Sequence, residues 1–64
     1  MPDNWISQLP NGKSVEYTYE NRTEQLASAT ARVAGSEIVH QLNNIATGMS
    51  RRDVEKLFRD DLTT

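Results

Sequence analysis

Polar and apolar side chains alternate over residues 14–20, which predicts a β-strand with one buried face. The two faces are Val15, Tyr17 and Tyr19 on one side and Ser14, Glu16, Thr18 and Glu20 on the other. β-branched and aromatic residues at a period of two are typical of a half-buried strand. A single strand would leave its backbone hydrogen-bonding groups without partners, so we expect a second strand beside it, from this chain or from another copy.

Residues 5–9 are the expected partner strand. Trp5, Ile6 and Leu9 occur at positions i, i+1 and i+4, which suits one helical turn as well as a strand, and both alternatives stay open. The segment Pro10-Asn11-Gly12-Lys13 follows. Because Asn-Gly tolerates the positive φ angles of a type I′ turn, it favours a hairpin. We therefore predict an N-terminal β-hairpin over residues 5–9 and 14–20.

A stripe of apolar residues follows at spacings of four and three, which is the period of a helix. Its members are Ala27, Ala31, Ala34, Ile38, Leu42 and Ile45. Asn21 is a candidate N-cap, and Glu24 stands at the third helical position, where it reaches back to the cap. The stripe keeps its phase across Gly35, and a glycine inside a helix costs only about 1 kcal/mol. We predict one long helix over about 22–47, with Gly35 as the point at which it could kink.

The end of the chain predicts a second, shorter helix. Gly48 is placed to end the long helix as a C′ glycine. Ser50 and Asp53 form an S-x-x-D capping box for a helix over about 51–62. Its expected buried face is formed by Val54, Leu57, Phe58 and Leu62. The predicted fold class is therefore α+β, with a hairpin, a long helix, a turn at Gly48 and a C-terminal helix.

The length of the chain favours self-association. Sixty-four residues make a single small domain, 1–64, whose core supplies roughly 3–5 kcal/mol. The chain has no cysteine and one histidine, so we expect no disulfide, no metal site and no cofactor. Ideal packing or a partner must then stabilise the domain, and we predict a homodimer.

Charge and motif content exclude several functional classes. Seven basic against nine acidic residues give a net charge of −2, unlike a protein that mainly clamps phosphates. No export signal or membrane-length apolar run is present, so we expect a cytoplasmic protein. A nucleophile elbow and a glycine-rich phosphate loop are also lacking, and a small domain rarely encloses a substrate pocket. We predict a non-enzyme without a small-molecule substrate.

Aromatic and small residues are the candidate protein interface. Trp and Tyr are common interface anchors, and small residues let another backbone approach closely. The candidates are Trp5, Tyr17, Tyr19, Ala27, Ala31 and Ala34. We predict a small protein that acts through protein–protein contacts, as an inhibitor, an antitoxin-like protein or a phage or plasmid accessory protein. The hairpin and helix predicted over residues 5–34 also resemble a phage head-completion protein of the lambda type.

DNA binding is the alternative function. The segment from Gly48 to Leu57 resembles the turn and second helix of helix-turn-helix repressors, with Val54 and Leu57 six and nine positions after the glycine. That resemblance implies contact with the major groove. The residues that would face DNA are Arg51, Arg52, Lys56 and Arg59.

The predicted order of strand, helix, Gly-x-Ser and helix is also similar to a ribbon-helix-helix dimer. In that arrangement Glu16 and Glu20 would face phosphates, which repel them. The pairs Arg51–Glu55 and Lys56–Asp60 are spaced i, i+4, as on a solvated helix face. The charges therefore favour a protein partner over DNA.

Overall fold

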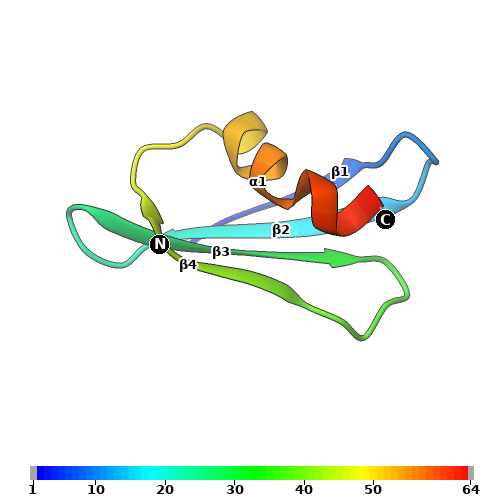
Figure 1. The fold of residues 1–64 in the computed structure, drawn as a ribbon, viewed down its shortest axis with the longest axis horizontal. Coiled ribbons are helices and arrows are strands. Elements are labelled where there is room, and N and C mark those ends of the chain that lie inside the picture. Colours follow the sequence, from blue (N-terminus) through cyan, green and yellow to red (C-terminus); the bar gives the residue numbers. More distant parts are fainter. Residues whose placement is uncertain (1, 64) are drawn as a thin grey trace.

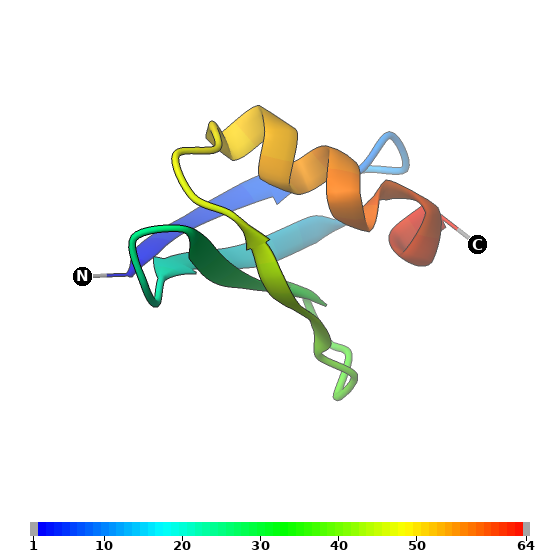
Figure 2. The ribbon, with the colours of Figure 1, turned by 60° about the vertical axis from the view of Figure 1, so that its left-hand side comes forward.

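Residues 2–63 fold into one antiparallel sheet with a helix on one face. The computed structural model describes residues 2–63; Met1 and Thr64, the ends of the predicted 1–64 domain, lie outside that range. Its elements are β1 (Asp3–Gln8), β2 (Ser14–Asn21), β3 (Leu26–Val33), β4 (His40–Ala46) and α1 (Arg51–Thr63). The four strands follow one another in the order β1-β2-β3-β4 (Figure 1). Figure 2 shows α1 on one side of the sheet, with the opposite side uncovered by any element of residues 2–63.

The predicted fold class is wrong in its central element, because no long helix exists over 22–47. That segment forms β3 and β4. Ala27, Ala29 and Ala31 are buried and alternate with the more exposed Ser28 and Thr30. A spacing of four residues is also two periods of a strand, so the alanine stripe fits both structures. The resemblance to a phage head-completion protein required a helix in this segment and fails with it.

A β-bulge explains why the stripe kept a helical spacing through β4. Ala27 pairs with Ile45, whereas Ala29 pairs with Leu42, so β4 carries one extra residue here. Asn44 lies in this bulge with φ 60, a left-handed conformation that asparagine tolerates better than most residues. The extra residue places Leu42 and Ile45, three positions apart, on the same side of the sheet. In an unbulged strand they would point to opposite sides.

The predicted helix start is instead the end of β2, at Asn21, and the turn that joins it to β3. Thr23 Oγ1 accepts hydrogen bonds from the backbone N–H groups of Gln25 (3.2 Å) and Leu26 (2.9 Å). The N–H groups of Arg22 and Thr23 both donate to the Leu26 carbonyl, at 2.9 and 3.0 Å. Short polar side chains stabilise turns with the same hydrogen bonds that cap helices. Gly35, the expected kink, has φ 84 in the turn after β3.

The N-terminal segment is the predicted hairpin, in its strand alternative. β1 pairs with β2 from Asp3–Tyr19 to Gln8–Ser14. The connection differs from the expected type I′ turn, because Gly12 (φ 86) has a positive φ and Asn11 does not. Gly12 N–H donates to the Leu9 carbonyl (2.8 Å), and Leu9 N–H donates to the Lys13 carbonyl (2.8 Å). These bonds define a three-residue loop with glycine in the left-handed position.

The core lies between α1 and the middle strands. It comprises Val15, Tyr17, Tyr19, Ala27, Ala29, Ala31, Val54 and Phe58. Because the β3 side chains beneath the helix are alanines, the α1 backbone can approach β3 and the large Phe58 ring can be fully buried. Leu57, expected on the buried face of the helix, is instead 42% exposed.

The helix begins where the sequence predicts. Gly48 has φ 76, and Ser50 Oγ accepts a hydrogen bond from Asp53 N–H at 3.2 Å, as an N-cap does. Tyr19 ties this turn to the sheet, because its hydroxyl donates to the Ala46 carbonyl (2.7 Å) and accepts from Met49 N–H (3.2 Å). The start of α1 is therefore fixed both locally and by β2.

We expect Phe58→Ala to bring the free energy of unfolding close to zero, so that about half of the protein is unfolded at room temperature. Removing a buried phenylalanine costs about 3–5 kcal/mol, which equals the roughly 3–5 kcal/mol that a core of this size supplies. Circular dichroism during urea denaturation measures the loss. The matched control is Leu57→Ala on the same helix, where the side chain is 42% exposed and the loss should be much smaller. Equal losses for the two variants would contradict the assigned core.

Candidate protein-binding groove

Trp5 joins β1 to the helix. Its indole ring stacks on Tyr17 with centroids 5.4 Å apart and an interplanar angle of 16°. Tyr17 in turn contacts Phe58, with centroids 6.2 Å apart. The indole Nε1–H donates to Glu55 Oε2 at 3.0 Å, so the half-buried tryptophan has both an apolar and a polar partner. These three contacts therefore hold Glu55, and the side of α1 that carries it, in position.

Arg51 contributes a second contact between β1 and α1. Its Nε and Nη2 donate to the two carboxylate oxygens of Asp3, at 3.0 and 2.8 Å. The guanidinium carbon also lies 5.2 Å from the centroid of the Trp5 ring. The hydrogen bond from Arg51 lowers the pKa of Asp3 below its ordinary value. Both charges remain partly exposed, so this pair orients α1 more than it stabilises the fold.

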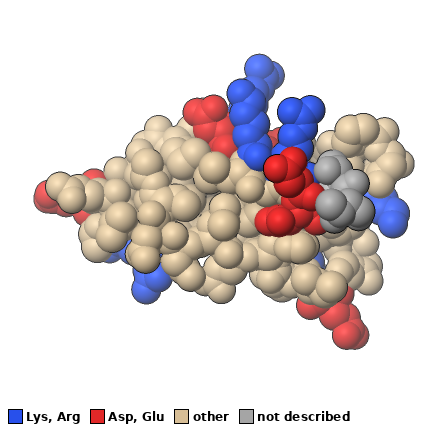
Figure 3. Space-filling view, in the orientation of Figure 1, with Lys and Arg blue, Asp and Glu red and all other residues tan. Residues whose placement is uncertain are grey.

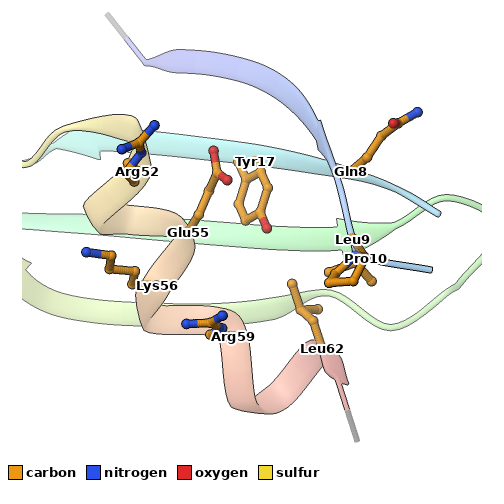
Figure 4. A pocket seen from close by; sticks show the side chains of 9 residues that line it. All are labelled: Gln8, Leu9, Pro10, Tyr17, Arg52, Glu55, Lys56, Arg59 and Leu62. Atoms are coloured by element: carbon orange, nitrogen blue, oxygen red, sulfur yellow. The ribbon is translucent and has the colours of Figure 1, made fainter. Parts of the chain in front are cut away.

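A groove opens between α1 and the end of the β1–β2 hairpin. It encloses about 290 Å³. Its lining residues are Gln8, Leu9, Pro10, Tyr17, Arg52, Glu55, Lys56, Arg59 and Leu62. Figure 4 shows Glu55 and Tyr17 side by side in the middle, with Leu9 and Pro10 across from Leu62. The groove thus has apolar residues at its hairpin end and cationic residues along the helix.

The cationic side of the groove is formed by one ridge of α1. Arg52, Lys56 and Arg59 stand at positions i, i+4 and i+7, and the structure brings all three to the groove wall. Glu55 is the acidic residue of the lining, and one of its oxygens already accepts the Trp5 hydrogen bond. The groove therefore presents a predominantly positive wall to a ligand.

Acidic residues accompany this ridge along the helix. Figure 3 shows basic and acidic side chains together over α1. The helix carries four basic residues, Arg51, Arg52, Lys56 and Arg59, and four acidic ones, Asp53, Glu55, Asp60 and Asp61. Its formal charge is therefore zero. A surface for the phosphate backbone needs a clear excess of cations, which α1 does not have.

The structure places most of the predicted interface residues inside the protein. Tyr17 and Tyr19 are buried beneath the helix, as are Ala27 and Ala31. Trp5 is half-buried in the contacts described above. Ala34 is exposed in the turn after β3, where its N–H donates to the Ser14 carbonyl at 2.8 Å. Their side-chain contacts are largely those that join sheet and helix within one chain.

The predicted nucleic-acid residues are brought together only in part. Arg52, Lys56 and Arg59 share the groove wall, whereas Arg51 binds Asp3. A helix-turn-helix needs a helix before Gly48, and β4 occupies that place. A ribbon-helix-helix needs an intermolecular strand pair followed by two helices, whereas β2 pairs with β1 and β3 of its own chain. Both motif resemblances are therefore wrong.

Sequence reasoning missed the apolar part of the groove. Leu9 follows β1 and Leu62 lies near the end of α1, 53 positions later. The available signal was the expected buried face of the C-terminal helix, which includes Leu62. Its neighbour across the groove depends on where α1 crosses the hairpin, and no local pattern contains that information.

Comparisons with protein-family models, with curated proteins and with solved structures find no match for this chain. Within residues 2–63, no three His, Cys, Asp or Glu side chains gather as a metal site would require. The same residues include no helix with the length and apolar character needed to cross a membrane.

We expect Tyr17 to titrate above its ordinary pKa of 10.0, because burial disfavours the phenolate and the Glu55 carboxylate repels it. The stability that this shift contributes is fully present below about pH 10 and is lost as the pH rises through the raised folded-state pKa. NMR chemical shifts of the Tyr17 ring carbons against pH measure the titration.

Glu55→Gln should move the Tyr17 pKa back toward its ordinary value while leaving an oxygen to accept the Trp5 hydrogen bond. Glu20→Gln is the matched control, since Glu20 is an exposed residue of β2. An unshifted Tyr17 titration in the unmodified protein would contradict the position assigned to its hydroxyl.

Proposed function

We propose that this protein is a non-catalytic binding protein that acts through protein–protein contacts, of the inhibitor, antitoxin-like or accessory type. Its ligand is a partner segment that carries both apolar and acidic side chains, and that segment occupies the groove between α1 and the hairpin. The observation that supports the proposal is the combination of an apolar end, formed by Leu9, Pro10 and Leu62, with a cationic wall on one helix.

The two parts of the groove would contribute differently to binding. Burying one leucine-sized side chain of the partner against Leu9 and Leu62 is worth about 1.5–3 kcal/mol. An exposed ion pair with Arg52 or Lys56 is worth about 0.2–1 kcal/mol. The apolar contact therefore supplies most of the affinity. The cations select acidic partners and set the orientation in which they bind.

Duplex DNA fits the same ridge less well. The four basic residues of α1 are matched by four acidic ones, and Arg51 is already held by Asp3. An acidic peptide can place a carboxylate beside Arg52, which stands eight and nine positions before Asp60 and Asp61 on the helix. A continuous phosphate backbone follows the whole helix face and meets both charges.

Selection from a random peptide library displayed on phage tests the proposal. We expect enriched peptides to combine aspartate or glutamate with a large apolar residue. A synthetic peptide of the enriched sequence should bind about tenfold more weakly to Arg52→Glu, because an attractive charge becomes repulsive and 1.4 kcal/mol corresponds to a factor of ten. Leu62→Ala should also weaken binding. Fluorescence anisotropy of the labelled peptide measures both effects.

Arg22→Glu is the matched control, since it makes the same charge change in the exposed β2–β3 turn, at the opposite end of the sheet from the hairpin loop (Figure 1). If Arg22→Glu weakened binding equally, the effect would come from net charge alone, and this result would contradict the assignment of the binding site to the groove. Enrichment of basic peptides would overturn the proposal. So would duplex DNA binding that falls steeply with salt and is lost in Arg52→Glu.

A further inference from the structure

The two edges of the sheet differ in how well they are protected against pairing with another strand. Unpaired backbone N–H and C=O groups at a sheet edge bind a further strand unless a bulge, a charge or a proline prevents it. β4 is interrupted by the bulge at Asn44, whereas β1 pairs with β2 over six consecutive residues without a register shift. β1 is therefore the regular edge.

The hydrogen bonds of the hairpin show which β1 groups face outward. Leu9 N–H donates to the Lys13 carbonyl, so the backbone of Leu9 faces β2. Antiparallel strands alternate between residues that bond their neighbour and residues that face away. Because the register is uninterrupted, the odd-numbered residues of β1 face β2 as Leu9 does. The N–H and C=O groups of Asn4, Ile6 and Gln8 therefore point away from β2. This edge can form hydrogen bonds with another strand centred on Ile6.

The side chains along this edge also favour contact. Ile6 is 69% exposed on the face of the sheet opposite the helix. It lies in a shallow hollow of about 500 Å³, lined by Asn4, Trp5, Ile6, Glu16, Tyr17 and Thr18. The charged residue of β1 is Asp3, whose carboxylate is matched by Arg51. β1 thus lacks the lysine, proline or bulge that usually protects an edge.

We propose that β1 is a dimerisation strand, and that its partner is β1 of a second copy of this chain. The two strands pair antiparallel about a twofold axis at Ile6, so that Ile6 faces the partner subunit's Ile6 and Asn4 faces the partner subunit's Gln8. The pairing extends the four-stranded sheet to eight strands. A twofold axis perpendicular to the sheet places both helices on the same face.

The register explains why a second copy fits this edge. Apolar Ile6 meets an apolar residue, and the amide side chains of Asn4 and Gln8 meet amides, so no like charges stand opposite one another. Glu16 of β2 is the cross-strand neighbour of Ile6. It forms a salt bridge with Arg32 of β3 at 3.0 Å, so it brings no uncompensated charge to the contact. A chain of 64 residues buries only a modest share of its surface, and pairing of the two β1 edges buries more of it.

Sedimentation equilibrium over a wide concentration range tests this proposal. We expect the unmodified protein to be a dimer, and Ile6→Lys to weaken association at least tenfold by placing two ammonium groups at the twofold axis. Ile6→Pro removes one outward N–H without removing a bond to β2 and should have the same effect. Ile38→Lys is the matched control, because Ile38 is 65% exposed in the loop before β4.

Amide hydrogen exchange supplies a readout that does not depend on any substitution. The N–H groups of Asn4, Ile6 and Gln8 should exchange slowly in the dimer and rapidly on dilution to monomer. A protein that stays monomeric at millimolar concentration would overturn the proposal. So would a dimer that survives Ile6→Lys, or one whose protected edge is β4. Peptide binding in the groove should persist in Ile6→Lys, which separates failure of the dimer from failure of the proposed function.

Discussion

The burial of Phe58 against the alanine face of β3 is the contact on which the rest of the structure depends. A sheet this small has one core, and the helix supplies two of its three largest fully buried side chains, Phe58 and Val54. Larger side chains at Ala29 or Ala31 would hold α1 away from the sheet and expose the tyrosines of β2. The alanines that suggested a long helix are therefore a requirement of the sheet–helix packing.

The position of α1 over the sheet also creates the candidate binding site. Contacts from Trp5 to Glu55 and from Asp3 to Arg51 hold the first turns of the helix over β1. Its later turns then pass the hairpin loop, where the groove opens. Basic residues that look equivalent in the sequence therefore differ in their contacts. Arg51 binds Asp3 of β1, whereas Arg52 and Lys56 line the groove. The open edge of β1 ends at this site, so the proposed binding and the proposed self-association would both involve Gln8, which lines the groove and lies on the outer edge of β1.

About half of the candidate site was predictable from the sequence. Arg52, Lys56 and Arg59 were identified, together with Arg51, as candidate DNA-facing residues through the resemblance of the segment from Gly48 to Leu57 to a helix-turn-helix. Leu9 and Pro10 carried no functional signal, since a hairpin loop commonly contains such residues. The aromatic cluster was recognised, but its assignment to an interface was made without knowing that α1 folds back and covers Tyr17 and Tyr19.

The sequence by itself determined the elements whose signals are local. The alternation over residues 14–20 specifies a strand, and Gly48 with Ser50 specifies where the last helix begins. The tertiary structure decided the state of residues 26–46. Alanine favours helices intrinsically, and Ala27 and Ala31 satisfy the periods of both structures. Hydrogen bonding to β2 on one side and a bulge at Asn44 on the other resolve that ambiguity, and both depend on residues distant in the chain.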